Sequence, residues 1–447
     1  MRSDLRLASS FRDPSGFVYR EDGRIRRFVA PEYAPTLDLL VSCGLYDKLV
    51  AAKILIAHKE IDGADRIIEP ELVETISYPY EWCFGQYKAA ALTTLRLQRA
   101  AINHGLSLKD ASAFNIQFHE GNPALIDTLS FEPYIEGGPW KAYHQFCSHF
   151  LAPLAVMSHV DIRLGKLMAE YIGGFPIDLA SKLLPGTTKL NSGLAMHLHL
   201  HAKMSGKGGS DKREAKVSKV ALMGIVESLQ KTIEKLDWNP EGTVWADYYS
   251  ETNYSDDAML AKRDLVGKYI RQVNPEVVWD LGANSGEFSN IAAETARHVV
   301  AWDFDEAAVE KNFRDPKRSK SVLPLIVDLT NPTPGLGWAG KERDSFMERA
   351  NPDCVLALAL VHHLAIANNV PLEEIGRFLG TLSKNLIIEF VPKSDSQVKR
   401  LLSTREDIYV DYNESGFASA FEKTFEIVNR ESVRGTDRTL FLLRKRA

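Results

Sequence analysis

One stretch, Val277–Phe288, constrains the fold of this chain more than any other, and it reads Val-Val-Trp-Asp-Leu-Gly-Ala-Asn-Ser-Gly-Glu-Phe. Its apolar start around Val278 is typical of a buried parallel strand. Residues 282–286 then predict a tight turn, and a helix is expected from about Glu287 to Ala296. Glycine suits such a turn because a positive φ costs it little and because a ligand can approach its backbone closely. The sequence therefore predicts a ligand site where this strand ends.

Aspartates follow two further apolar segments. The predicted strand His298–Trp302 is followed by Asp303, and the predicted strand Val322–Val327 is followed by Asp328. Together with Asp280, these acids would lie at the carboxyl edge of a parallel sheet, where doubly wound folds bind ligands. An ionised carboxylate can accept hydrogen bonds from two hydroxyl groups. We therefore predict an α/β fold with its binding site at this edge.

The pattern D-x-G-x-x-x-G of Asp280–Gly286 differs from the dinucleotide fingerprint G-x-G-x-x-G and resembles motif I of the class I S-adenosylmethionine (SAM) methyltransferases. The resemblance implies a Rossmann-like, seven-stranded sheet over residues 245–447, with SAM as cofactor. It implies that the glycine loop surrounds the amino-acid end of SAM, that Asp303 accepts from the ribose hydroxyls and that Asp328 accepts from the adenine amino group. The expected cofactor-binding residues are Asp280, Gly282, Ala283, Asn284, Gly286, Asp303, Phe304, Asp328, Leu329, Tyr249 and Tyr254. For the two tyrosines, packing on the sheet edge is an equally good account.

Candidate catalytic residues follow from the next two predicted strands. The fourth strand runs into His362 and His363, and the fifth contains Glu389 near its carboxyl end. In the resembled family this edge faces the transferred methyl group, and a neutral imidazole could accept the proton of a hydroxyl or amine acceptor. Alternatively, one histidine caps the strand while the other packs, and Glu389 forms a structural ion pair with Lys393.

A second motif lies in the N-terminal half. Asn115 follows Asp110 by five positions, and Asp127 ends the next short strand. This spacing resembles the catalytic and metal-binding loops of the protein-kinase-like phosphotransferases. The resemblance implies that Asp110 acts on an attacking hydroxyl and that Asn115 and Asp127 hold magnesium. The family's glycine-rich loop and lysine strand are missing, however, and the three residues could equally hydrogen-bond their own loops.

The chain divides at a glycine-rich, charged segment. We expect an α+β domain, of kinase-like type in the resemblance, over residues 1–202, a linker at 203–215, a connecting helix at 216–244 and the methyltransferase domain at 245–447. The motif His197-Leu-His-Leu-His201 is expected on a helix, where only its first and last histidines align. No metal site is predicted there.

Composition narrows the functional classes. Hydrophobic residues make up 45% of the 447 residues and the formal net charge is −5, which gives no indication of a nucleic-acid partner. The four cysteines lack metal or disulfide spacing, and the longest apolar run, Val355–Val361, is too short to span a membrane. We therefore expect a cytoplasmic protein.

The sequence leads to one functional hypothesis and two alternatives. The main hypothesis is a SAM-dependent methyltransferase acting on an unidentified oxygen or nitrogen acceptor, a small molecule or a protein, with the N-terminal domain recognising the substrate. One alternative is a scaffold or sensor without turnover. The other is a bifunctional phosphotransferase and methyltransferase.

Overall fold

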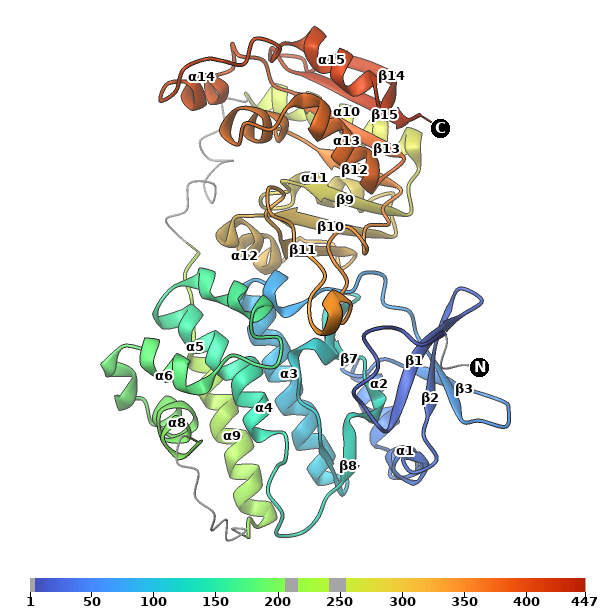
Figure 1. Cartoon of the computed structure of the whole chain (residues 1–447), viewed down its shortest axis with the longest axis vertical. Coiled ribbons are helices and arrows are strands. Elements are labelled where there is room, and N and C mark those ends of the chain that lie inside the picture. The colour runs from blue at the N-terminus through green and yellow to red at the C-terminus, as the bar shows by residue number, and fades with distance from the viewer. Residues whose placement is uncertain (1–4, 206–215, 241–254, 447) are drawn as a thin grey trace. The chain divides into compact units, whose positions relative to one another are not determined.

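The computed structural model describes residues 5–205, 216–240 and 255–446, which form two compact units (Figure 1). Unit 1 consists of Met1–Asn239 together with Gly335–Arg343, and unit 2 of Pro240–Pro334 together with Asp344–Ala447. Tyr249 and Tyr254, predicted to contact the cofactor, lie outside the described residues. No helix in the described ranges is long and apolar enough to cross a membrane.

Unit 1 begins with a small antiparallel sheet in the order β1-β2-β4-β3. Its strands are β1 (Gly16–Glu21), β2 (Arg24–Val29), β3 (His58–Ile61) and β4 (Ile67–Pro70). Asp22 and Gly23 join β1 to β2, and both have positive φ values, as the turn of a tight hairpin requires. Two short antiparallel pairs follow: β5 (Leu106–Leu108) with β8 (Phe131–Pro133), and β6 (Ile116–His119) with β7 (Asn122–Leu125).

Helices form the rest of unit 1. The α-helices are α1 (Ala34–Ser42), α2 (Leu45–Ala51), α3 (Phe84–Asn103), α4 (Tyr143–Phe146), α5 (Ala152–His159), α6 (Ile177–Leu183), α7 (Ser192–Leu194), α8 (His201–Ser205) and α9 (Lys219–Lys235). Short 3-10 or π-helical segments are η2 (Pro79–Glu81), η3 (Ala113–Asn115), η4 (Thr128–Ser130), η5 (Cys147–Leu151), η6 (Ile162–Ala169), η7 (Gly186–Leu190) and η8 (Ala195–Leu200).

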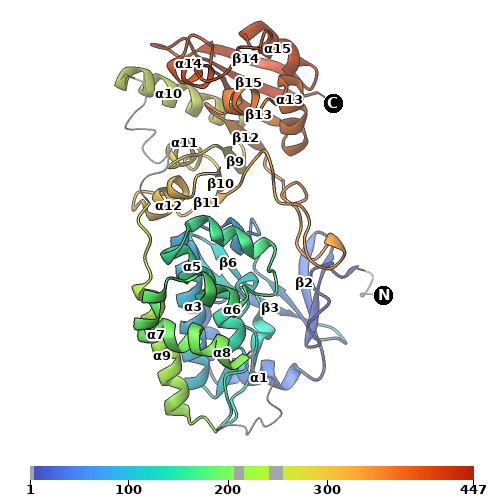
Figure 2. The same ribbon diagram turned by 60° about the vertical axis from the view of Figure 1, so that its left-hand side comes forward.

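Two predicted boundaries differ from the compact units and the helix ends of the structure. The helix expected to connect the domains, α9, belongs to unit 1, where it lies alongside α3 (Figure 2). It buries Leu222, Val226, Leu229 and Ile233. The linker is expected from residue 203, whereas α8 continues the helical backbone to Ser205, the last described residue before the segment 206–215. Helical hydrogen bonding thus extends further into the charged segment than its composition indicated.

Unit 2 contains one sheet of seven strands in the order β11-β10-β9-β12-β13-β15-β14 (Figure 1). The strands are β9 (Val277–Leu281), β10 (His298–Asp303), β11 (Val322–Ile326), β12 (Cys354–Ala357), β13 (Asn385–Phe390), β14 (Phe425–Ser432) and β15 (Thr439–Lys445). The pairs among β9 to β13 are parallel, whereas β15 runs antiparallel to both β13 and β14. This confirms the α/β class and the seven strands predicted for this half of the chain.

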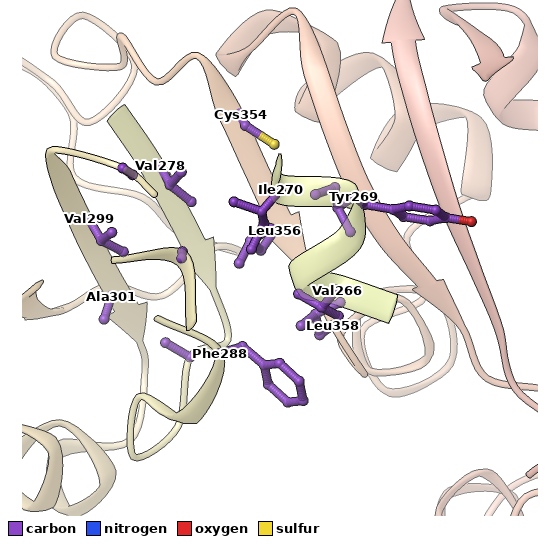
Figure 3. Packing of buried hydrophobic residues seen from close by; sticks show 14 of the residues in the cluster. Val266, Tyr269, Ile270, Val278, Phe288, Val299, Ala301, Cys354, Leu356 and Leu358 are labelled. Atoms are coloured by element: carbon purple, nitrogen blue, oxygen red, sulfur yellow. The ribbon is translucent and has the colours of Figure 1, made fainter. Parts of the chain in front are cut away.

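The helices of unit 2 are α10 (Asp256–Val273), α11 (Glu287–Ala292), α12 (Glu306–Arg314), α13 (Leu372–Leu382), α14 (Ser396–Leu402) and α15 (Glu414–Glu422), with short segments η9 (Trp338–Gly340, in the part assigned to unit 1) and η10 (His363–Ala367). Figure 3 shows the core on one face of the sheet, where Val266 and Ile270 of α10 pack with Leu356 and Leu358. Side chains alternate between the two faces of a strand, so the residues next to these core positions in sequence lie on the opposite face of the sheet. There, Trp279 and Trp302 pack together with their ring centroids 5.3 Å apart.

The strand order fixes where a ligand can bind. Chain connections run outward from β9 toward β10 and β11 on one side and from β12 toward β13 on the other. The crevice between the carboxyl ends of β9 and β12 is therefore the topological switch point, where open α/β sheets bind ligands.

Candidate functional site

A cavity of about 260 Å³ opens at this switch point. Residues from the carboxyl ends of β9 to β12 and from α10, α11 and η10 line it. The lining residues are Met259, Lys262, Asp280, Gly282, Ala283, Asn284, Phe288, Trp302, Asp303, Phe304, Val327, Asp328, Leu329, Thr330, Leu358, Ala359, Leu360, His363, Leu364 and Asn368. The structure thus brings most of the predicted cofactor residues around one cavity.

The glycine loop is held against the end of β10. The backbone N–H groups of Gly282 and Ala283 both donate to the carbonyl oxygen of Trp302, at 2.8 and 3.0 Å. Gly286 ends the loop with φ +85°, and a Cβ at this position would overlap the side chain of Asn312. Both the backbone angle and the space therefore require glycine at residue 286. Gly286 itself is not among the cavity-lining residues, so its contribution is to the shape of the loop.

Asp303 links the loop to the cavity. Its Oδ2 accepts from the backbone N–H of Asn284 at 2.7 Å, and its Oδ1 accepts from the N–H of Asp305 at 2.9 Å. Asn284 has φ +49°, a left-handed conformation that asparagine tolerates better than most residues. Burial raises the pKa of the Asp303 carboxyl to about 6, although the backbone hydrogen bonds oppose this rise. The carboxylate that lines the cavity therefore also fixes the loop.

Asp280 lies on β9 beneath the loop and is only 2% exposed. The Ser289 hydroxyl donates to its Oδ2 at 2.6 Å. Burial raises the pKa of Asp280 to about 7, and the nearby Asp303 contributes to the rise. A positively charged ligand in the cavity would favour the ionised form of both carboxyls.

Asp328 and Phe304 lie at the more open side of the cavity. Asp328 follows β11, is exposed, and its Oδ1 accepts from both the backbone N–H and the hydroxyl of Thr330, at 2.9 and 2.6 Å. Phe304 is 52% exposed although it lines the cavity, and Leu329 lines it as well. An acceptor-only carboxylate beside apolar side chains suits a flat heterocycle that carries an amino group.

The two histidines differ in their access to the cavity. His363, the first residue of η10, lines it, whereas His362 is fully buried and does not. Burial lowers the pKa of His363 to about 4, and Arg438 adds to this effect. His363 is therefore a neutral imidazole at neutral pH, and the same burial makes it a weaker base than an exposed histidine. The rings of the two histidines pack against each other with centroids 4.1 Å apart.

The predicted ion pair between Glu389 and Lys393 is wrong. Lys393 donates to Asp407 and to the carbonyl oxygen of Tyr409, whereas Glu389 accepts from Lys262 of α10 at 2.8 Å. Glu389 is 0% exposed and does not line the cavity, so it has no direct contact with the space where a substrate would bind. The reason is its position within β13, where the side chain packs between the sheet and α10.

Several lining residues were missed in the sequence. Lys262 could have been found, because it occupies the i+3 position after Met259 and the i−4 position before Val266, on the apolar face of α10. Ala359 gave no signal, yet it adopts φ +50° just after β12. A left-handed conformation is uncommon for alanine and tends to occur at binding sites.

The kinase-like candidates of unit 1 take part in local hydrogen bonds. Asp110 accepts from the backbone N–H of Ser112 and from the Gln145 amide, at 2.9 and 2.8 Å. Asp127 caps η4 by accepting from the N–H of Leu129 at 2.8 Å. Its carboxylate also pairs with the guanidinium of Arg27 at 2.5 Å, and Arg27 is 8% exposed. The alternative that these residues stabilise their own loops therefore matches the geometry.

Asn115 and His197 of the histidine motif also hydrogen-bond to hydroxyl groups of unit 1. The Asn115 amide lies 3.5 Å from the Ser130 hydroxyl. His197 contacts the hydroxyls of Tyr143 and Ser228, at 2.8 and 3.0 Å. Over the described ranges, no group of three or more histidine, cysteine or acidic side chains is arranged to hold a metal ion.

No protein-family profile matches the chain. Nodulation protein NoeA of Rhizobium meliloti (strain 1021) is 38% identical to it over 456 aligned residues, which cover 98% of this chain and 95% of that protein. The chain belongs to the NoeA family.

Solved structures similar to part of this NoeA-family chain include methyltransferases. N-methyltransferase NodS from Bradyrhizobium japonicum WM9 has a TM-score of 0.33 and 10% identity, covering 43% of this chain and 99% of NodS. Magnesium protoporphyrin IX methyltransferase from Synechocystis PCC 6803 has a TM-score of 0.31 and 16% identity, covering 45% of this chain and 93% of that enzyme. NodS has also been solved with S-adenosyl-L-homocysteine, and the Synechocystis enzyme with SAM.

Proposed function

We propose that this protein is a SAM-dependent methyltransferase whose cofactor site is the cavity of unit 2. The observation that carries the proposal is the position of Asp303, which ends β10, lines the cavity and fixes the glycine loop at the switch point. A carboxylate here accepts hydrogen bonds from vicinal hydroxyls, as the resemblance to the class I methyltransferases implies. Asp328, Leu329 and Phe304 would then surround the adenine.

The residues around the cavity suit methyl transfer. SAM supplies a methyl group on a sulfonium, a good leaving group, so the protein mainly needs to bind and align the reactants. His363 lines the cavity and is neutral, so it is positioned to take the proton of a hydroxyl or amine acceptor, although burial weakens its basicity. The acceptor itself is not identified, and the name of the NoeA relative refers to nodulation without giving one.

Calorimetric titration of SAM and S-adenosylhomocysteine into wild type and Asp303→Ala tests the proposal. Loss of a charge-assisted pair of hydrogen bonds should cost roughly 2–4 kcal/mol, which corresponds to about 30- to 1000-fold in affinity. Wild type should bind both ligands, and the variant should bind them much more weakly.

Asp353→Ala is the matched control. Asp353 precedes β12 and its Oδ2 accepts from the backbone N–H groups of Glu276 and Val277, at 3.0 and 2.9 Å. Like Asp303, it fixes backbone by accepting N–H hydrogen bonds. It does so at the amino ends of the parallel strands, away from the cavity at their carboxyl ends. Asp353→Ala should lose stability and keep its affinity for SAM. Wild type that fails to bind either ligand would contradict the proposal.

Unit 1 has a separate proposed role, recognition of the methyl acceptor. The alternative that this unit is a phosphotransferase is opposed by the ion pair between Arg27 and Asp127. The guanidinium binds the carboxylate that would otherwise hold magnesium. Titration of magnesium and ATP into the protein provides the test, because a phosphotransferase must bind the pair at millimolar concentration.

A further inference from the structure

Lys262 lines the cavity but belongs to none of the motifs that predicted the site. Its side chain is 3% exposed, and its Nζ donates to Oε2 of Glu389 at 2.8 Å. Arg438 lies on the other side of the same carboxylate, with its Nη1 3.7 Å from Oε2, and its Nε donates to Asp395 at 2.8 Å. Four buried or nearly buried charges of alternating sign thus run from the cavity wall to the start of α14.

The ammonium end of Lys262 lies beside other cavity-lining groups. Its Nζ is 4.8 Å from the centroid of the Phe288 ring. Burial lowers the pKa of Lys262, whereas the nearby carboxyl groups of Glu389 and Asp280 oppose this effect. Phe288 and Asp280 both line the cavity. The charged end of the lysine is therefore at the cavity wall, next to the glycine loop.

The charges around the cavity are unevenly distributed. Asp280, Asp303 and Asp328 are acidic, and His363 is neutral at neutral pH. Among the lining residues in the described ranges, Lys262 is the only lysine or arginine. A negatively charged group of a ligand would therefore find its counter-charge at Lys262.

A purely structural role would be to tie α10 to β13. Such a tie does not need a charge, because well-packed apolar residues replace buried ion pairs with little loss or even a gain of stability. Nor does a tie require the ammonium to lie beside the cavity. The position of the Lys262–Glu389 pair is explained if Glu389 holds the Lys262 ammonium at the cavity wall, where it can contact a bound ligand.

We propose that Lys262 binds the carboxylate at the amino-acid end of the cofactor and that Glu389 positions the Lys262 ammonium for this contact. The inference rests on the proposed function and adds a ligand-binding residue and a positioning residue to it. It also gives Glu389 an indirect role at the site, which acts through Lys262.

Two probes separate the carboxylate from the rest of the ligand. S-adenosylhomocysteine carries the amino-acid group, whereas 5′-methylthioadenosine has the same adenosine and thioether without it. Calorimetry should show that Lys262→Met weakens S-adenosylhomocysteine about 10- to 100-fold, which is the loss expected for one charge-assisted hydrogen bond with its ion pair. Binding of 5′-methylthioadenosine should change less than about twofold. Glu389→Gln should show the same selectivity with a smaller loss.

Lys268→Met is the control. Lys268 is on the same helix and pairs with Glu431 at 2.8 Å, but it is exposed and away from the cavity, so both affinities should stay unchanged. If Lys262→Met does not fold, the double variant Lys262→Met/Glu389→Gln removes the unpaired buried charge and takes its place.

Three results are decisive. The inference would be overturned if wild type and Lys262→Met bound S-adenosylhomocysteine with equal affinity. It would also be overturned if Lys262→Met and the double variant lost affinity for S-adenosylhomocysteine and for 5′-methylthioadenosine by the same factor. Wild type that binds neither ligand would contradict the proposed function itself, which keeps the two failures distinct.

Discussion

The Asp303 side chain both fixes backbone and lines the cavity. Its two oxygens accept from the backbone of Asn284 and Asp305, and the same carboxylate lines the cavity. Asp303→Ala therefore removes both a carboxylate of the cavity wall and the hydrogen bond that fixes the loop. The Asp353 control distinguishes these effects from a general loss of strand-end hydrogen bonds, because Asp353 fixes backbone in the same way at the other edge of the sheet.

The raised pKa of Asp280 predicts a pH-dependent stability. Burial raises it to about 7 in the folded protein, so between about pH 4 and pH 7 the folded state binds more protons than the unfolded state. The contribution of Asp280 to the free energy of unfolding is complete at low pH and is lost as the pH rises through about 7. Asp280→Asn should remove up to about 3 kcal/mol of this dependence over the window from pH 5 to 8, measured by denaturant unfolding without ligand.

The free energy of unfolding of Asp280→Asn should still depend on pH in part, because burial raises the pKa of Asp303 to about 6. Above pH 7, Asp280→Asn should be more stable than wild type, because it no longer has to bury a negative charge. Parallel pH profiles for the two proteins would show that Asp280 does not titrate in this range.

At the scale of elements, the turn between β9 and α11 depends on Gly286. Gly286→Ala introduces a Cβ at φ +85° that overlaps the Asn312 side chain. We expect a loss of about 1–3 kcal/mol in the free energy of unfolding and weaker SAM binding, because the Asn284–Asp303 contact must move. Chemical unfolding and calorimetry measure the two effects.

Gly224→Ala is the opposite case and serves as control. Gly224 lies within α9, and an added Cβ would meet nothing within 4 Å. Alanine favours a helix over glycine by about 0.5–1 kcal/mol, so this variant should be more stable than wild type. Similar losses in both variants would mean that the turn geometry at residue 286 is not the cause.

The sequence predicted much of unit 2, because its information is local. Apolar strands, a glycine turn and strand-end acids each leave a pattern in a few consecutive residues, and Asp280, Asp303 and Asp328 do surround one cavity. Contacts between distant segments leave no such pattern. The Lys262–Glu389 pair joins a helix before the first strand to the fifth strand, and this is why Lys393 was predicted as the partner instead.

The same reason explains the differences in unit 1. The spacing of Asp110, Asn115 and Asp127 is visible in the sequence, but the guanidinium that pairs with Asp127 comes from β2, far earlier in the chain. The histidine motif offered no hint of its partners either, because Tyr143 and Ser228 lie on other helices. Local spacing identified these residues without revealing what they contact.

At the scale of the whole molecule, unit 1 is built from two separate pieces of chain. Gly335–Arg343, between β11 and β12, belongs to it. Glu342 accepts two hydrogen bonds from Arg12, at 2.7 and 3.0 Å, and the Arg343 guanidinium lies 4.5 Å from the centre of the Phe114 ring. Leu336 and Arg343 exchange backbone hydrogen bonds, so the segment folds back on itself.

A fragment of residues 1–239 should therefore be less stable than the same fragment extended by residues 334–344 through a flexible linker. An ion pair with one exposed partner and one cation–π contact should add about 1–2 kcal/mol, or a few degrees in Tm. Thermal melts of both fragments measure the difference. The extended fragment that carries Glu342→Gln and Arg343→Ala should return to the lower Tm of residues 1–239. If these substitutions leave the Tm of the extended fragment unchanged, the two contacts do not stabilise the unit.

That unit 1 consists of two separate chain segments also has a consequence for the synthesis of the protein. Translation runs from the N-terminus, so the first 239 residues leave the ribosome well before the piece that completes their unit. Pro240–Pro334, with the first three strands of the second sheet, must emerge in between. Unit 1 thus spends part of its synthesis without the segment that contacts Arg12 and Phe114, and it is complete only after the first three strands of unit 2 have left the ribosome.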